Sequence, residues 1–199
     1  MIRAVLFDLD GVIRHFSPEH VAEIERRHGL DTGALEAVAF TDPVIGEVTT
    51  GRITRAEWVA HIGNKIGRME AAEEWGQQPS RLDVEVLELN DEIRALGLAT
   101  AILTNGTDSI ADEMTALGLT DRFDQIFNSA EIGYAKPDIR AFRHVLQTLG
   151  MHGPEVFFTD DSGPKLIGAD AVQIRTHHYA NVNALRSALT DAGVPIEIR

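Results

Sequence analysis

The chain begins with a six-residue apolar run, Ile2 to Phe7, that leads directly into Asp8-Leu9-Asp10-Gly11. A short run of branched and aromatic residues predicts a buried strand, and the aspartates mark where that strand ends. Because side chains i and i+2 of an extended chain point the same way, the carboxylates of Asp8 and Asp10 are expected to converge on one spot. Carboxylates that close repel each other unless a cation or a shared proton intervenes. Taken alone, the Asp-Gly pair is equally compatible with an ordinary turn and solvated aspartates.

Later apolar runs are also followed by polar clusters. Three further strands and the polar residues that follow each are Ala99 to Leu103 with Thr104-Asn105-Gly106, Asp124 to Phe127 with Tyr134-Ala135-Lys136-Pro137-Asp138, and Val156 to Phe158 with Thr159-Asp160-Asp161-Ser162. Open parallel sheets bind ligands in the crevice outside the carboxyl ends of their strands. The polar clusters are therefore expected to meet at one edge of a sheet.

Segments with helical periodicity alternate with these strands. The expected elements are helices over Asp83 to Leu96, Ser109 to Leu117 and Val182 to Leu189, a helix capped by Asp138 and ended by Gly150, and a last short strand over Val172 to Ile174. Such alternation predicts an α/β fold, a Rossmann-like parallel sheet with helices on both faces.

A long stretch between the first and second strands, about Arg14 to Ser80, has little alternating β pattern. Thr54-Arg55-Ala56-Glu57 is a capping-box pattern, so a helix is expected to begin there. Because so long a segment cannot be a structureless loop in a compact domain, we expect a small α-helical insertion with Trp58 and Trp75 in its core. The predicted division is a core of residues 1–14 and 81–199 and a helical cap of residues 15–80.

Composition limits the partners of the chain. Its 199 residues suffice for one well-buried domain with a modest insertion, and the absence of cysteine fits a reducing cytoplasm. With 31 acidic and 18 basic side chains the net charge is −13, which opposes binding to nucleic acid or to anionic lipid. We therefore expect a cytoplasmic protein, monomer or weak dimer, whose small anionic substrate is attracted by a metal ion and Lys136.

Four motifs in one order resemble those of the haloacid dehalogenase superfamily of phosphohydrolases. They are Asp8-Leu9-Asp10-Gly11-Val12, Leu103-Thr104-Asn105-Gly106, Lys136-Pro137-Asp138 and Asp160-Asp161-Ser162, and the resemblance runs from Met1 to about Tyr179. The position of the insertion, directly after the first motif, is similar to the subgroup with a small helical cap, which includes sugar phosphatases and epoxide-hydrolase-like members.

The resemblance implies catalytic roles for three residues. Asp8 is the implied nucleophile, which forms an aspartyl phosphate. Asp10 is the implied general acid and then base, and an aspartate here favours phosphoryl transfer over the metal-free dehalogenation of relatives that usually lack it. Lys136 would neutralise charge on the phosphoryl group and keep Asp8 ionised.

The resemblance also implies a Mg²⁺ site. Its ligands are Asp8, the backbone carbonyl of Asp10 and Asp161, with Asp160 as a further ligand or directly behind the ligands. Four clustered carboxylates cannot all stay ionised without a cation, and Mg²⁺ prefers oxygen ligands. The alternative for Asp160 and Asp161 is an acidic loop that caps the helix after Ser162.

Thr104, with the backbone amides of Asn105 and Gly106, is expected to hold phosphoryl oxygens where a helix follows a strand. Alone, Thr-Asn-Gly is more often only a turn. One departure from the family pattern is Lys165, which stands where relatives with paired aspartates often have asparagine. That substitution puts the surroundings of the metal in doubt.

Other residues are assigned by position alone. Adjacent side chains on a strand diverge, so His177 and His178 are expected at a surface or cleft edge rather than on a metal. Caps supply selectivity and exclude water. The candidate selectivity residues are His15, Phe16, Phe40, Arg52 and Arg55.

The sequence thus predicts a Mg²⁺-dependent phosphomonoester hydrolase that acts through an aspartyl phosphate on a small phosphorylated metabolite such as a sugar phosphate. Two alternatives remain open. One is a phosphotransferase such as a sugar-phosphate mutase, which shares all four motifs, and the other is a catalytically silent regulatory or binding module of the same fold.

Overall fold

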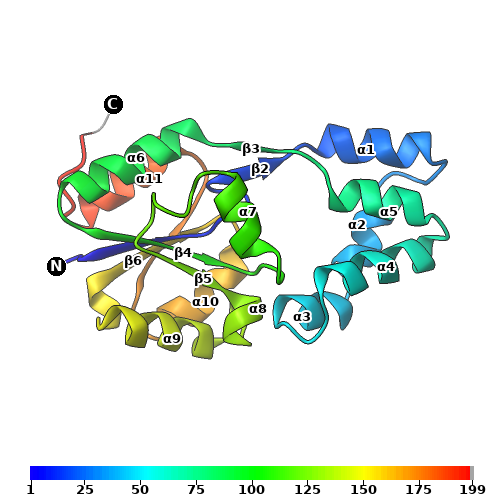
Figure 1. Cartoon of the computed structure of the whole chain (residues 1–199). Coiled ribbons are helices and arrows are strands. Elements are labelled where there is room, and N and C mark those ends of the chain that lie inside the picture. The colour runs from blue at the N-terminus through cyan, green and yellow to red at the C-terminus, as the bar shows by residue number, and fades with distance from the viewer. Residues whose placement is uncertain (198–199) are drawn as a thin grey trace.

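A five-stranded parallel sheet forms the centre of the computed structural model, which describes residues 1–197 (Figure 1). The strand order is β5-β4-β1-β6-β7, and every neighbouring pair is parallel. The strands are β1 (Ala4–Phe7), β4 (Ala99–Thr104), β5 (Gln125–Asn128), β6 (Val156–Asp160) and β7 (Arg175–His178). The predicted α/β fold with a parallel sheet is confirmed.

Helices cover both faces of this sheet because successive strand residues alternate between two hydrophobic clusters. Phe7 and Phe157 belong to one cluster, and Leu6 and Phe158 belong to the other. The first cluster takes in side chains of α6 (Val84–Ala95), α7 (Ile110–Ala116) and α11 (Val182–Asp191). The second takes in α9 (Ile139–Leu149) and α10 (Gly163–Asp170), and the short elements α8 (Ser129–Ile132) and η1 (Gly153–Glu155) complete the core.

Five helices follow one another between residues 18 and 76 and make up what we call the helical insertion. They are α1 (Pro18–Arg27), α2 (Ala34–Ala39), α3 (Val44–Thr49), α4 (Arg55–Ile66) and α5 (Met69–Gly76). They pack around a hydrophobic cluster of their own, in which Trp58 and Trp75 are buried as predicted. Thr54 and Glu57 form the predicted capping box at the start of α4.

Two strands that the sequence did not predict connect the insertion to the core. β2 (Arg14–Phe16) pairs antiparallel with β3 (Ser80–Leu82), so the chain leaves and re-enters the core side by side (Figure 1). Three residues are too few to show a period-2 pattern. The pairing therefore follows from the closure of the insertion rather than from local sequence.

The last strand lies later than predicted. Val172 and Gln173 are in the turn after α10, where Gln173 has a φ of 62°, and β7 begins only at Arg175. The apolar Ile174 is buried but precedes the residues that pair with β6. β7 is an edge strand in contact with solvent, which explains why its own residues are polar.

The helix predicted over residues 83–96 has exposed apolar residues at both of its ends, where burial was expected. Leu87 and Ile93 are buried as expected, but Val84 at the first position and Leu96 at the C-cap are exposed. Terminal positions of a helix project beyond the surface that the central turns cover. Within residues 1–197, no helix combines the length and the apolar character that crossing a membrane requires.

Candidate active site

The four motifs meet at the carboxyl end of the sheet. Asp8 directly follows β1, Thr104 is the last residue of β4, and Asp160 is the last residue of β6. Because β1 lies between β4 and β6 in the same direction, the ends of all three strands fall at one edge. Lys136 reaches this edge from the turn between α8 and α9.

A buried lysine joins two of these aspartates. Lys136 Nζ lies 2.7 Å from Asp8 Oδ1 and 2.7 Å from Asp160 Oδ2, and its side chain has no exposed surface. Burial disfavours the charge of Asp8, but the nearby charges of Lys136 and Lys165 outweigh burial, so the pKa of Asp8 lies below its ordinary value. For Asp160, burial outweighs the attraction of Lys136 and raises the pKa. Of these two carboxylates, Asp8 is therefore the one that stays ionised more readily.

Asn105 has a role that the sequence did not predict. Its side-chain oxygen accepts a hydrogen bond from the backbone N–H of Lys136 at 2.7 Å, and its amide nitrogen donates to the Lys136 carbonyl at 2.8 Å. Both bonds hold the backbone that carries the lysine. A side-chain amide directly after a strand end was the available signal, because it can donate and accept at once.

Three carboxylates are close enough to share one metal ion. Oxygen atoms of Asp8, Asp160 and Asp161 lie within 4.8 Å of one another. Asp8 Oδ2 is buried and has no hydrogen-bond partner within residues 1–197, whereas Asp8 Oδ1 accepts from Lys136 and from the backbone N–H of Leu9. An unpartnered buried carboxylate oxygen is costly, and a hard cation with oxygen ligands satisfies it. The residues present therefore fit a divalent cation.

Asp160 and Asp161 differ in the contacts that their carboxylate oxygens make. Asp160 already has a partner at each oxygen, since Oδ2 faces Lys136 and Oδ1 accepts from the backbone N–H of Ser162 at 2.8 Å. This bond holds the turn before α10, whose N-cap residue Ser162 has no side-chain cap bond. The Asp161 carboxylate packs where a Cβ at residue 11 would stand, and this close approach requires Gly11, whose φ is +89°.

Lys165 lies close to Asp8, a contact that the sequence analysis did not predict. Its Nζ is 3.5 Å from Asp8 Oδ2, and its side chain is 32% exposed. Burial lowers the pKa of Lys165, but the charges of Asp8, Asp160 and Asp161 outweigh burial and raise it. The site thus has a second ammonium group where asparagine was expected. Its position on the first turn of α10, four residues after Asp161, was the signal for this contact.

Asp10 has a cation of its own. Arg14 donates from Nε to Asp10 Oδ1 at 2.6 Å and from Nη2 to Oδ2 at 3.1 Å, while Asp8 is paired with Lys136. Burial raises the pKa of Asp10 more than the bonds to Arg14 lower it. The sequence analysis missed Arg14, although its position four residues after Asp10 was visible.

The loop after β4 is tightly packed. Thr104 is buried, and a Cβ at Gly106 would clash with Ile110 at the start of α7. The side-chain amide of Asn128 donates to the Thr107 carbonyl at 2.8 Å and holds the loop from the β5 side. The glycine is required here because Ile110 and Asn128 approach it closely.

The candidate selectivity residues occupy different places. Arg55 contacts the core through its backbone N–H, which donates to Asp108 Oδ1 at 2.7 Å, and through Nε, which lies 3.8 Å from Glu113 Oε1. Its guanidinium also donates to the Gly76 carbonyl within the insertion. Phe40 is exposed and packs edge-on against Trp75 in the insertion. Arg52 is exposed.

The remaining candidates lie on the connecting strands and at the sheet edge. His15 Nε2 on β2 lies 3.3 Å from Asp83 Oδ2. The centroid of the Phe16 ring lies 5.0 Å from the guanidinium carbon of Arg14. His177 and His178 diverge as predicted. His177 Nδ1 pairs with the Thr159 hydroxyl at 3.1 Å, and His178 Nε2 lies 2.9 Å from the backbone oxygen of Asp161.

Comparison with known proteins places this site in a family. Residues 2–172 match the model of the haloacid dehalogenase-like hydrolases. The chain is 30% identical over 191 residues to bifunctional epoxide hydrolase 2 of Sus scrofa, covering 83% of this chain but only 34% of that protein. It is 29% identical over 194 residues to phosphatase MT3486 of Mycobacterium tuberculosis, covering 88% of this chain and 86% of that one.

Solved structures of the same fold agree. A predicted haloacid dehalogenase-like hydrolase of Porphyromonas gingivalis is 22% identical with a TM-score of 0.76, covering 96% of this chain and 97% of the other. A haloacid dehalogenase family enzyme of Bacteroides thetaiotaomicron, crystallised with magnesium and inorganic phosphate, is 22% identical with a TM-score of 0.74, covering 90% and 95%. The motifs, the fold and these matches together show that the chain belongs to the haloacid dehalogenase-like hydrolases and is a phosphatase of that family.

Proposed function

We propose that this protein is a Mg²⁺-dependent phosphomonoester hydrolase that acts on a small phosphorylated metabolite, such as a sugar phosphate, through an aspartyl phosphate. The observation that carries the proposal is the state of Asp8. Its carboxylate is held ionised by Lys136 at 2.7 Å, and Oδ2 is buried without a hydrogen-bond partner in the described chain. An ionised and oriented carboxylate is what this kind of nucleophile requires.

Asp8, Asp161 and the backbone carbonyl of Asp10 are the proposed Mg²⁺ ligands, with Asp160 as a further ligand or directly behind them. Their carboxylate cluster and the magnesium-containing relative of Bacteroides thetaiotaomicron support this assignment. When bound, the ion supplies positive charge that neutralises the phosphate and aligns it with the nucleophile.

Three side chains carry the proposed reaction. An Asp8 oxygen forms a bond to phosphorus while the bond from phosphorus to the leaving oxygen breaks, and Asp10 gives its proton to that oxygen. Water then attacks phosphorus, its proton passes to Asp10, and the bond from phosphorus to Asp8 breaks to release inorganic phosphate. Lys136 balances charge on the phosphoryl group in both steps.

The loop after β4 is the proposed phosphate cradle. The Thr104 hydroxyl and the backbone N–H groups of Asn105 and Gly106 would hold phosphoryl oxygens next to Asp8. Lys165 adds a second ammonium group near the other carboxylate oxygen of Asp8. This local positive charge lets a dianion approach a protein whose net charge is −13.

Residues 15–80 are the proposed cap, and residues 1–14 and 81–199 the proposed core. The separate hydrophobic cluster of the insertion and its connection through β2 and β3 support this division. His15, Phe16, Phe40, Arg52 and Arg55 remain the proposed selectivity residues, and Phe16, Phe40 and Arg52 are exposed.

A screen of phosphorylated metabolites with the purified protein and Mg²⁺ tests the proposed function. We expect one or more substrates to release inorganic phosphate, and rapid quench to trap a phosphoenzyme that Asp8→Asn lacks. Conversion of a sugar phosphate to its isomer would identify a mutase. Turnover of no substrate, with no trapped phosphoenzyme, would favour the silent binding module.

A further inference from the structure

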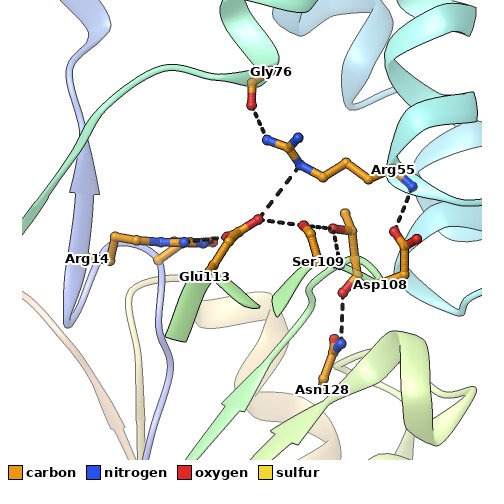
Figure 2. Close-up of polar contacts among 9 residues, drawn as sticks. Arg14, Arg55, Gly76, Asp108, Ser109, Glu113 and Asn128 are labelled. Carbon is orange, nitrogen blue, oxygen red and sulfur yellow. Dashed lines mark hydrogen bonds and ion pairs between the residues drawn. The ribbon is translucent and has the colours of Figure 1, made fainter. Parts of the chain in front are cut away.

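A line of polar contacts runs from Asp10 to the helical insertion. Arg14, which is 5% exposed, binds both oxygens of Asp10 and donates from Nη1 to Glu113 Oε2 at 2.6 Å. Figure 2 shows Glu113 between Arg14 on one side and Arg55 on the other. The guanidinium of Arg14 is thus fixed by two carboxylates, one in the motif that contains the nucleophile and one on α7.

Glu113 on α7 of the core also contacts the insertion. Its Oε1 accepts from the Ser109 hydroxyl at 2.5 Å and lies 3.8 Å from Nε of Arg55 on α4. Burial disfavours the charge of Glu113, but Ser109 and Arg14 outweigh it, so its pKa lies below the ordinary value. Glu113 is therefore ionised and contacts cations from both parts of the chain.

Arg55 is held in place from two sides. Its backbone N–H donates to Asp108, which lies in the loop after β4, and its guanidinium donates to the Gly76 carbonyl at the end of α5 (Figure 2). The Arg55 side chain thus links α5, through Gly76, to α7, through Glu113, while its backbone N–H joins α4 to the loop that carries the proposed phosphate cradle.

We propose that Arg14 and Glu113 are positioning residues that hold the Asp10 carboxylate in one orientation, and that Arg55 makes this orientation depend on the docking of the insertion. A planar guanidinium bound at two oxygens fixes the plane of the carboxylate, and it loses that constraint when its second anchor is removed. The proposal rests on the proposed function, because it assumes that Asp10 is the acid and base.

Glu113→Gln tests the kinetic consequence. General acid catalysis contributes about 10²- to 10⁴-fold, and a poor leaving group depends on it most. We expect the single-turnover rate of Asp8 phosphorylation, measured by rapid quench, to fall at least about tenfold for an alkyl phosphate and less than about threefold for nitrophenyl phosphate, whereas hydrolysis of the phosphoenzyme, in which Asp10 is the base, should slow equally for both. Arg55→Ala should shift the ratio of the two phosphorylation rates in the same direction, and Arg55→Lys, which keeps the charge, should restore much of it.

A matched control separates positioning from stability. Glu92 on α6 binds Arg186 on α11 through two bonds of 2.7 Å, an ion pair of the same kind outside the motifs. Glu92→Gln should leave the ratio of alkyl to aryl phosphorylation rates as in the wild type. Equal losses in the phosphorylation rate for both leaving groups in Glu113→Gln would overturn the positioning role, whereas a wild type that releases no phosphate from either substrate would overturn the proposed function.

Hydrogen exchange tests the coupling without any substrate. The loop after β1 is closed by backbone bonds from Gly11 N–H to the Arg14 carbonyl and from Arg14 N–H to the Leu9 carbonyl, both 2.8 Å. Arg55→Ala and Glu113→Gln should each speed amide exchange in the peptide that spans these residues, and Glu92→Gln should not. Unchanged exchange there in Arg55→Ala would show that the insertion does not act on Asp10.

Discussion

At the scale of single residues, the site brings buried charges of opposite sign into direct contact. Lys136 lies 2.7 Å from both Asp8 and Asp160, and Lys165 lies 3.5 Å from Asp8. Removing one member of a buried ion pair leaves an uncompensated charge and is strongly destabilising. Asp8→Asn keeps the shape of the side chain and leaves Lys136 its ion pair with Asp160, so no uncompensated charge remains at Lys136.

Asp8→Asn should abolish turnover and leave the fold intact. The amide is nearly isosteric with the carboxylate, but it cannot act as a carboxylate nucleophile, so kcat should fall at least about a thousandfold. Phosphate release and circular dichroism measure the two parts of this prediction. Appreciable phosphatase activity in a contaminant-free preparation would remove Asp8 from the role.

Lys165→Asn should tighten Mg²⁺ binding and weaken phosphate binding. The ammonium group competes with a cation for Asp8 and attracts an anion, and the partial exposure of the side chain moderates both effects to about three- to tenfold in Kd. Titration calorimetry with Mg²⁺ alone and then with inorganic phosphate measures them. Lys65→Asn is the control, since Lys65 is exposed on α4. Metal and phosphate affinities that move in the same direction would contradict this account.

At the scale of elements, the position of the insertion depends on close backbone contacts. α3 lies beside α8, and Figure 1 shows the two helices next to each other. Gly51, which follows α3 closely, has a φ of +71°, and a Cβ there would clash with the backbone oxygen of Ala130 on α8. The glycine is therefore required both by its conformation and by the contact between insertion and core.

Gly51→Ala should displace the insertion from α8. Gly33→Ala is a matched control, because Gly33 also has a positive φ, +84°, but nothing lies within 4 Å of the position that a Cβ would take there. Both variants should lose about 1 kcal/mol of unfolding free energy to backbone strain, and only Gly51→Ala should lose about 1–3 kcal/mol more and also lower kcat. Urea unfolding and phosphate release measure these effects, and equal losses for the two variants would contradict the contact.

At the scale of the whole molecule, an acidic protein places two lysines, Lys136 and Lys165, at one edge of the sheet. Both site lysines face the carboxylates that follow β1 and β6, although the net charge of the chain is −13. A bound cation would relieve the remaining repulsion among Asp8, Asp160 and Asp161. Metal binding and global stability are therefore linked.

Mg²⁺ should raise the melting temperature, and a chelator should abolish activity. Ligand at a hundredfold excess over Kd stabilises a fold by about 2.7 kcal/mol, and calorimetric scans with and without Mg²⁺ measure that shift. Ca²⁺ should support activity poorly, because it prefers more ligands and a looser geometry. Full activity in excess chelator would favour metal-free chemistry instead.

The sequence by itself predicted the parallel sheet, the helical insertion and the residues that gather at the strand ends. Each of these depends on local signals, such as the buried run before Asp8, the capping box at Thr54 and the order of the motifs. Strand direction and the fixed hand of the crossovers then bring Asp8, Thr104 and Asp160 together. The cytoplasmic location and the oligomeric state remain predictions.

Only the tertiary structure decided which charges pair. Asp10 binds Arg14, whereas Asp8 binds Lys136. Asn105 holds the backbone of Lys136, and Glu113 faces Arg55 from a distant part of the sequence. β2 and β3 pair only because the insertion closes on itself. Local patterns report burial and periodicity, whereas contacts between distant residues depend on how whole elements pack, and no short stretch of sequence contains that information.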